Sequence, residues 1–239
     1  MTAAAGTGIG FAAARRCALE GAEVVLSDRH EARLSEYAAR LASEIGRPVH
    51  AVPCDVTVED QVQALVSEAD ALLGGVDGFV NNAALGMTAP LVETTDEAWA
   101  RVIGTTLTAT MRCVRAELAL LVDRGRGAIV NLGSVVAWRA EAGQTAYAAA
   151  KAGVLALTRC AAMEAAETGV RVNAVVPSLA LHENLERVSD PAFLAGIAAS
   201  EAFGRAATPD EIANVIVFLL SDLSSYMTGE SIAVSSRHP

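Results

Sequence analysis

The sequence predicts an α/β fold, a doubly wound parallel sheet with helices on both faces. Short β-branched runs alternate with amphipathic helical patterns along the chain. The strand runs are continuously apolar, as expected for strands that helices cover on both faces. A glycine-rich turn opens the first helical pattern, as in sheets of this class. No linker, repeat or low-complexity tract interrupts residues 1–239, which are therefore predicted to form a single domain.

The elements follow one another in a regular order. Gly21 closes the first predicted helix and Gly46 the second, because glycine tolerates the left-handed conformation that ends many helices. Thr95 or Asp96 is a suitable N-cap for the long fourth helix. Right-handed helical crossovers between successive strands make the sheet parallel. The strands are predicted at 23–28, 49–55, 76–83, 127–134, 170–177 and 230–235, and the helices at 9–22, 31–46, 59–74, 95–123, 144–169, near 190–200 and at 208–220.

Composition excludes several classes of protein. Hydrophobic residues make up 52% of the chain, which excludes disorder. A net charge of −10 opposes binding to nucleic acid. The apolar runs are too short to span a membrane, and the N-terminus carries no secretory signal, so a cytoplasmic protein is expected. Cys17, Cys54, Cys113 and Cys160 match no zinc spacing, so we expect no metal site and predict buried free thiols.

The first turn and the end of the following strand suggest a dinucleotide site. Gly6, Gly8 and Gly10 lie before a helix, where the backbone can approach a pyrophosphate and the helix N-terminus offers free N–H groups. The alternative is a tight turn without a ligand. Asp28 ends the next strand, where a carboxylate can bind a ribose 2′-hydroxyl and repel a 2′-phosphate. This favours NAD over NADP, although the adjacent Arg29 could reduce the preference between the two cofactors. Asp28 is alternatively the N-cap of the following helix.

A strand that should precede the glycine turn is missing. Only residues 1–5 come before the first glycine, too few to supply it. In a doubly wound sheet this strand is central, so its absence would expose the edges of two neighbouring strands. We expect the sequence to be truncated at its N-terminus, with low stability and weak cofactor binding.

A serine, a tyrosine and a lysine form the candidate catalytic group. Tyr147 and Lys151 are four residues apart on an alanine-rich helix, one turn apart on the same face. A neighbouring ammonium is expected to lower the pKa of the phenol, which can then exchange a proton with a substrate oxygen. Ser134, at the end of a strand, can stabilise charge on that oxygen. The alternative is two ordinary solvated polar residues on the helix.

With these residues, the chain resembles the short-chain dehydrogenase/reductase family over essentially its whole length except the missing strand. The resemblance implies a Rossmann fold. Four further segments resemble a bacterial subgroup associated with sterol-ring catabolism on CoA-linked intermediates, often labelled 3-oxoacyl-carrier-protein reductases; they read "TAAAGTGIG", "YAAAKAGV", "EAFGRAA" and "SSYMTGE". The family segments are "GTGIG" (6–10), "CDV" (54–56), "NNAA" (81–84), Ser134, Tyr147-x-x-x-Lys151 and "RVNAVVPS" (171–178).

The resemblance also implies roles for individual residues. Tyr147 exchanges the proton, Ser134 binds the substrate oxygen, and Lys151 holds the nicotinamide ribose. Asn81 is alternatively a turn-forming residue at the end of its strand rather than a cofactor contact. The remaining implied cofactor contacts are Gly6, Gly8, Ile9, Gly10, Asp28, Asp55, Val56, Asn81, Ala83, Tyr147 and Pro177.

Two departures from the family pattern fall near the expected site. Thr106 stands where the family usually has an asparagine that holds a relay water; its hydroxyl can bond such a water or a backbone carbonyl, or the side chain simply packs. His182 stands where a threonine commonly contacts the cofactor carboxamide. We expect it to contact the carboxamide or the substrate, with an exposed loop position as the alternative.

The segment 179–206 is mostly apolar and resembles a family lid that closes over the substrate. Together with Trp138, it predicts a bulky apolar substrate. Trp138 is alternatively a core or interface residue. Arg139 can pair with a substrate carboxyl or a CoA phosphate, or remain an ordinary surface arginine.

We therefore predict an NAD-dependent oxidoreductase for a secondary alcohol or ketone on a bulky, CoA-linked sterol-derived substrate. The first alternative is an NADPH-dependent 3-oxoacyl thioester reductase. The second is a non-catalytic nucleotide-binding or scaffolding protein. It would be favoured by Thr106 and by Ser178, which follows Pro177 where the family usually has a glycine. The resemblance further implies a homodimer or homotetramer.

Overall fold

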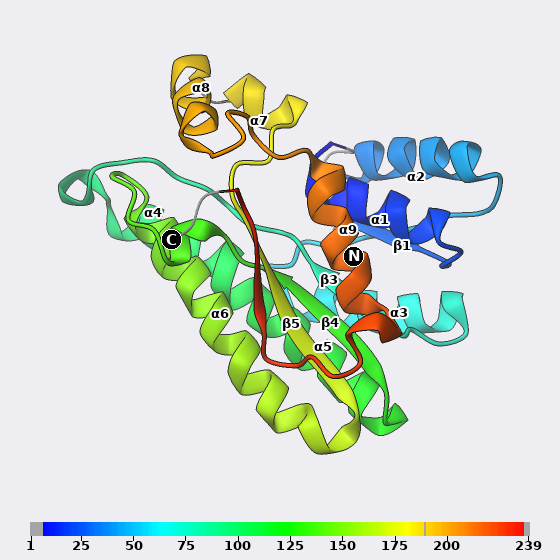
Figure 1. Cartoon of the computed structure of the whole chain (residues 1–239). Helices are drawn as coiled ribbons and strands as arrows, with labels where there is room; N and C mark the ends of the chain where they lie inside the picture. The colour runs from blue at the N-terminus through cyan, green and yellow to red at the C-terminus, as the bar shows by residue number, and fades with distance from the viewer. Residues whose placement is uncertain (1–6, 189, 237–239) are drawn as a thin grey trace.

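The computed structural model describes residues 7–188 and 190–236, and it confirms the predicted parallel α/β fold. The strands form two sheets, one with the order β1-β2 and one with the order β3-β4-β5-β6, and every pairing is parallel (Figure 1). The strand bounds are β1 (Val25–Asp28), β2 (His50–Pro53), β3 (Gly78–Asn81), β4 (Gly127–Leu132), β5 (Val170–Pro177) and β6 (Ser231–Val234).

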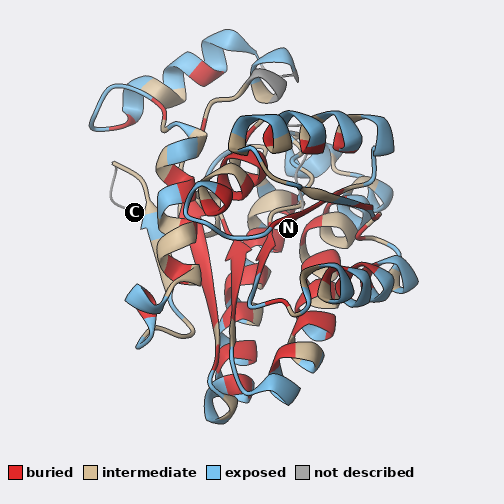
Figure 2. Cartoon of the chain, turned by 90° about the vertical axis from the view of Figure 1, so that its right-hand side faces the viewer, coloured by how far each residue is buried: buried red, intermediate tan, exposed pale blue. Residues whose placement is uncertain are grey.

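Helices cover both faces of the strands, as Figures 1 and 2 show. The α-helices are α1 (Ile9–Leu19), α2 (Glu31–Ile45), α3 (Glu59–Leu73), α4 (Asp96–Ile103), α5 (Ala109–Arg124), α6 (Thr145–Ala165), α7 (Glu183–Val188), α8 (Pro191–Ser200) and α9 (Pro209–Leu220). Side chains of successive strand residues point to opposite faces. On β1, Val25 accordingly belongs to the cluster around α3 and α5, whereas Leu26 packs with α1 and α2.

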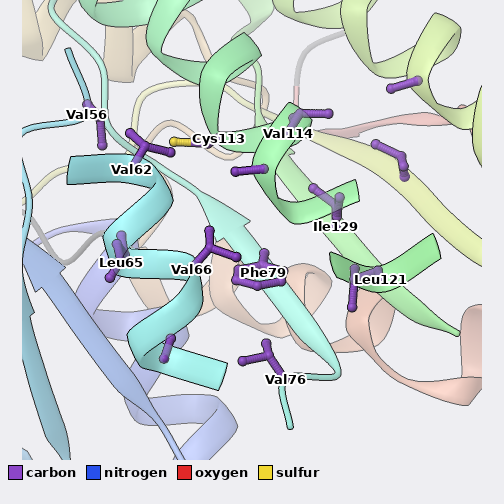
Figure 3. Close-up of a cluster of buried hydrophobic side chains, with 14 of the residues drawn as sticks. Val56, Val62, Leu65, Val66, Val76, Phe79, Cys113, Val114, Leu121 and Ile129 are labelled. Carbon is purple, nitrogen blue, oxygen red and sulfur yellow. The ribbon is translucent and has the colours of Figure 1, made fainter. Parts of the chain in front are cut away.

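The largest apolar cluster lies between the strands and the helices α3, α5 and α6. Figure 3 shows Phe79 of β3 and Ile129 of β4 facing Val66 of α3 and Leu121 of α5. Ile129 and Leu121 are completely buried. A second cluster on the other face joins α1 and α9 to β3, β4 and β5. These two clusters fix the strand ends, and with them the loops that leave the sheet.

The break between the two sheets falls between β1 and β3. Among the described residues, β1 pairs with β2 alone and β3 pairs with β4 alone. A small cavity separates β1 from β3, and Glu117 of α5 contributes a carboxyl to its wall. The other lining residues are Val25, Val62, Leu65, Val66, Ala69, Phe79, Val80, Asn81 and Cys113.

The structure corrects the predicted helix boundaries at three places. Helix α1 ends at Leu19 rather than 22, because Gly21 N–H donates to Ala18 O and Ala22 N–H donates to Cys17 O in a glycine-terminated cap. The long helix predicted at 95–123 is broken by a π-helical turn, η2 (Gly104–Thr108). The lid segment contains α7, which the sequence pattern did not indicate.

The prediction of four buried thiols was wrong for one cysteine. Cys17, Cys54 and Cys113 are buried, but Cys160 is exposed. Its neighbours Ala161 and Ala162 on α6 pack against the sheet. Cys160 falls between the buried Thr158 and Ala161, on the side of α6 turned away from the sheet, so its apolar neighbours in the sequence did not imply burial.

We expect Leu121→Ala to lower the free energy of unfolding by about 2–5 kcal/mol, because it leaves a cavity among side chains that cannot fully collapse. Leu223→Ala is the matched control, since Leu223 is 83% exposed and its truncation should change stability by less than about 0.5 kcal/mol. Urea denaturation of both variants would measure the difference. Equal losses would show that the packing around Leu121 is not as described.

Candidate active site

The candidate site lies at the carboxyl ends of the parallel strands, where doubly wound sheets bind ligands. Ser134 follows β4, Pro177 ends β5 and Asn81 ends β3. Gly133, just before Ser134, allows close packing: a Cβ there would lie 2.8 Å from Leu155 Cδ2 and 3.0 Å from Val176 Cγ2. The approach of α6 to the end of β4 therefore depends on the missing side chain at Gly133.

The structure brings Ser134, Tyr147 and Lys151 together. A hydrogen bond joins the side chains of Ser134 and Tyr147. The Lys151 Nζ lies 5.6 Å from the centre of the Tyr147 ring and donates to the carbonyl oxygen of Leu132 at 2.5 Å. Lys151 is 3% exposed, and the Leu132 carbonyl supplies the hydrogen-bond acceptor that its buried ammonium group needs.

Burial controls the proton affinities of this group. It raises the pKa of Tyr147 to about 12, although the hydrogen bond from Ser134 acts in the opposite direction. Burial also lowers the pKa of Lys151 to about 7. The expected lowering of the phenol pKa is therefore not present in this structure, because desolvation of the phenolate outweighs the opposing hydrogen bond from Ser134.

Thr106 lies inside the π-helical turn η2 and is completely buried. Its hydroxyl donates to the carbonyl oxygen of Leu85 at 3.3 Å and accepts from the Leu85 N–H at 3.0 Å. Thr110 Oγ1 donates to the Thr106 carbonyl at 2.7 Å, which gives this backbone oxygen of the π-helical turn a hydrogen-bond donor. The hydroxyl thus bonds the backbone, the alternative that the sequence left open, and fixes the loop after β3.

Asn81 is anchored inside the protein by a carboxyl that sequence reasoning missed. Asn81 Nδ2 donates to Glu117 Oε2 at 2.8 Å and to Asn131 Oδ1 at 3.0 Å. Asn131 Nδ2 donates to Thr158 Oγ1 at 3.0 Å. A buried chain of polar groups therefore runs from α5 through β3 and β4 to α6. The spacing of Glu117 four residues after the buried Cys113 was the available signal for its burial.

Several predicted cofactor residues surround a second small cavity. Val56, Asn81 and Ala83 line it together with Ala109, Thr110 and Cys113. Asp55, beside Val56, accepts from the Thr57 hydroxyl at 2.7 Å and from the Thr57 N–H at 2.9 Å, which lowers its pKa. Asp28 Oδ1 accepts from the His30 N–H at 2.9 Å, and His30, not Asp28, is the N-cap of α2.

The glycine turn fits a dinucleotide phosphate. Gly8 has a φ of 87°, a conformation that favours glycine, and α1 begins at Ile9. Thr7 Oγ1 is buried and has no partner within residues 7–188 and 190–236, so a polar ligand atom would satisfy it. Gly10 is buried within α1, and the predicted contact Gly6 lies outside the described residues. A buried orphan hydroxyl beside a free helix N-terminus is the chemistry that a phosphate group requires.

The residues predicted to contact substrate have different surroundings. Trp138 is 42% exposed. Arg139 forms an ion pair with Glu201 at 3.8 Å and donates to Ser235 Oγ at 2.9 Å, so its guanidinium is engaged within the chain. Glu201 is 5% exposed, and its Oε2 also accepts from the N–H and the hydroxyl of Ser236. His182 is half-buried against the glycine turn.

The described ranges offer neither a metal cluster nor a membrane-spanning helix. In residues 7–188 and 190–236, no three His, Cys, Asp or Glu side chains are grouped so that they could hold a metal ion. Within the same ranges, no helix is both long enough and apolar enough to cross a bilayer.

Comparison with known proteins gives one consistent result. Residues 3–236 match the family described as Enoyl-(Acyl carrier protein) reductase. The chain is 54% identical to a (5R,7aS)-5-hydroxy-7a-methyl-1-oxo-2,3,5,6,7,7a-hexahydro-1H-indene-carboxyl-CoA reductase of Mycobacterium tuberculosis, covering 100% of this chain and 92% of that protein. It is 39% identical to a cis-4-hydroxycyclohexanecarboxylate dehydrogenase of Sinomonas cyclohexanicum, covering 98% and 93%. A short chain dehydrogenase of Mycobacterium smegmatis superimposes with a TM-score of 0.88 at 50% identity, covering 100% and 91%.

Glu117→Gln tests the buried carboxyl through pH. Burial raises the pKa of Glu117 from 4.5 to about 7, so the folded protein keeps a proton that the unfolded chain has lost. The contribution of Glu117 to stability is therefore fully present below about pH 4.5 and is lost as the pH rises through 7. Relative to wild type, Glu117→Gln should gain up to about 3 kcal/mol in free energy of unfolding between about pH 5 and pH 8.5.

Denaturant titrations at several pH values would measure this gain. Glu164→Gln is the control, because Glu164 lies on the exposed side of α6 and should show no such trend. A constant difference between Glu117→Gln and wild type across this pH range would contradict the assignment of a raised pKa.

Proposed function

Because the chain belongs to the short-chain dehydrogenase/reductase family, we propose that it transfers a hydride between NAD(H) and a secondary alcohol or ketone on a CoA-linked ring substrate. Oxidoreductase activity on a hydroxyl or carbonyl carbon, with a nicotinamide dinucleotide, comes with the family. The observation that carries the proposal is the meeting of Ser134, Tyr147 and Lys151 at the carboxyl end of β4.

Tyr147 is the proposed proton donor in ketone reduction. The nicotinamide supplies the hydride to the carbonyl carbon when it is bound. Tyr147 gives its hydroxyl proton to the carbonyl oxygen, which becomes the alcohol, and Ser134 donates a hydrogen bond to the same oxygen. Because burial makes the phenolate costly, the phenol remains protonated until the substrate oxygen accepts charge. In alcohol oxidation the proton moves the other way.

Lys151 has two proposed tasks. Its position one turn after Tyr147, with Nζ on the Leu132 carbonyl, keeps a cation near the phenolate that forms as the proton leaves. Its pKa of about 7 lets it release and regain a proton near neutral pH, so it can return a proton to Tyr147. The hydroxyl of Thr106 is engaged with the Leu85 backbone, so we assign no proton step to it.

The preference for NAD rests on the end of β1. Asp28 stands at the position where a carboxylate accepts hydrogen bonds from a ribose 2′-hydroxyl. Gly8, Ile9 and Gly10 lie where α1 begins and offer N–H groups to the pyrophosphate. Val56, which follows Asp55 after β2, is the proposed adenine contact on that side.

The substrate class rests on the lid and on the relatives. Phe193 of α8 is 41% exposed and Phe203, just after α8, is 77% exposed, which supports an apolar substrate beneath this segment. Both curated relatives are named for ring compounds that carry a carboxyl group, and the more similar one for its CoA thioester. We extend this chemistry to the present chain as a proposal.

Homo-oligomer formation is part of the same proposal. Met163 on α6 is 75% exposed, and Tyr226, just before β6, is fully exposed. Large apolar or aromatic side chains with this exposure support a contact between copies of the chain.

A second candidate, an NADPH-dependent 3-oxoacyl thioester reductase, is favoured by one observation. The charge of Arg29 acts on Asp55 and helps to lower its pKa, so a cation lies near the end of β1. A guanidinium at this place can bind a 2′-phosphate.

Tyr147→Phe should abolish ketone reduction, with a loss in kcat of about 10²–10⁴-fold, because the proton donor is removed. The substrates to compare are a hydroindanone carboxyl-CoA thioester, a 3-oxoacyl-CoA and a free cyclic ketone. Absorbance of the reduced nicotinamide measures turnover. Tyr226→Phe is the matched control, since this fully exposed tyrosine is far along the chain from Tyr147. Unimpaired turnover by Tyr147→Phe would end the catalytic proposal, and turnover of the 3-oxoacyl-CoA alone would favour the second candidate.

Wild-type protein should bind NADH at least about tenfold more tightly than NADPH, a difference of about 1.4 kcal/mol. Asp28→Ser should reduce this preference, because it removes the acceptor for the 2′-hydroxyl and the repulsion of a 2′-phosphate. Nicotinamide fluorescence titrations give both dissociation constants. Asp77→Ser is the control, because Asp77 precedes β3 at the opposite end of the strands. A wild-type preference for NADPH would overturn the assignment.

A further inference from the structure

His182 occupies a fixed position between the sheet and the lid. Ala180 and Ala207 form a β-bridge, and the Leu181 N–H donates to the Ala207 carbonyl at 3.2 Å. The N–H groups of Leu185 and Glu186 both donate to the carbonyl oxygen of His182, at 2.9 and 3.1 Å, so His182 starts α7. Figure 1 shows α7 and α8 beyond the end of β5. The first helix of the lid therefore begins at a residue that is held by backbone hydrogen bonds before it and after it.

The imidazole of His182 lies directly against the glycine turn. A Cβ added to Gly8 would be 3.3 Å from His182 Cδ2 and 3.3 Å from His182 Nε2. The ring therefore contacts the bare α-carbon of Gly8, although the two residues are far apart in the sequence. Any group that approaches the backbone at Gly8 from this side meets the His182 ring.

Two polar atoms of the residues at this contact lack hydrogen-bond partners among the described residues. The Nδ1 atom of His182 is buried and has no hydrogen-bond partner in the described part of the chain, and the same is true of Thr7 Oγ1, the hydroxyl next to Gly8. Buried polar atoms are usually satisfied, so an orphan hydroxyl next to Gly8 and an orphan ring nitrogen on the histidine that packs against Gly8 indicate a missing polar ligand. Both can donate a hydrogen bond, a neutral imidazole through one ring N–H and threonine through its hydroxyl. Two donors beside the N-terminus of α1 favour an anion.

We propose that His182 is a cofactor-binding residue of the lid, whose ring N–H donates to the pyrophosphate of the dinucleotide seated on the glycine turn. This deepens the proposed function and rests on it. It also changes the expected role of His182, because its ring faces the phosphate-binding turn rather than the substrate or the carboxamide. Since His182 starts α7, the same contact links cofactor binding to the position of the lid.

The charge around His182 agrees with a neutral ring that donates one hydrogen bond. Burial lowers its pKa, and the carboxylate of Glu186 on α7 opposes that shift. From the side of the glycine turn, the N-terminal end of α1 presents a partial positive charge, which also disfavours an imidazolium. An anionic phosphate between the ring and α1 would offset this repulsion.

Binding of NADH and of ADP-ribose to His182→Ala tests the proposal without any turnover. ADP-ribose carries the pyrophosphate but no nicotinamide, so it separates a phosphate contact from a carboxamide contact. Both ligands should bind roughly tenfold more weakly to His182→Ala, the size expected for one hydrogen bond to a charged group. His182→Asn, which keeps a donor, should recover part of the loss. His50→Ala is the matched control, because His50 begins β2 at the opposite end of the strands.

Each outcome decides between the alternatives. Calorimetry measures both affinities, and circular dichroism establishes that each variant is folded. Weaker binding of NADH alone would overturn the phosphate contact in favour of the carboxamide, and unchanged binding of both ligands would overturn any contact with the cofactor. If wild type binds neither ligand, the proposed function itself fails, which is distinct from a failure confined to His182→Ala.

Discussion

The buried ammonium group of Lys151 is the constraint on which the candidate site depends. It needs an acceptor inside the protein, and the Leu132 carbonyl at the end of β4 provides one at 2.5 Å. This contact joins α6 to the sheet at the place where the chain turns toward Ser134. Because Tyr147 precedes Lys151 by one helical turn, fixing the lysine also fixes the phenol beside the serine. A buried, partly desolvated cation is costly, and sites that bind or transform ligands often retain such groups.

A second buried polar system supports the same region from below. Glu117, Asn81, Asn131 and Thr158 form one hydrogen-bonded chain across the sheet, from α5 to α6. Each of these hydrogen bonds joins elements that lie beneath the loops of the site. Replacing it with apolar groups would remove the desolvation cost of Glu117, but also the specific alignment of β3 against β4 and α6. These hydrogen bonds therefore link the stability of the core to the position of the loop after Asn81.

The lid is connected to the body of the protein at two places of opposite character. At its start, His182 touches Gly8 through an unsatisfied imidazole, which leaves that contact responsive to a ligand. At its end, the buried carboxylate of Glu201 holds Arg139 and the segment after β6 through an ion pair and hydrogen bonds. Charged groups that are buried and paired resist separation more than a van der Waals contact does. We infer that movement of the lid is easier at His182 than at Glu201.

The sequence by itself determined the alternation of strands and helices, the parallel sheet, and the spacing of Tyr147 and Lys151 on one helix face. These follow from local periodicity and helix geometry, which adjacent residues encode. Only the tertiary structure decided that Asn81 pairs with Glu117, that Arg139 pairs with Glu201 and that His182 lies on Gly8. It also decided the π-helical turn at Thr106 and the exposure of Cys160. Each depends on residues far apart in the chain, or on which side of a helix meets the sheet, and packing of the whole domain sets both.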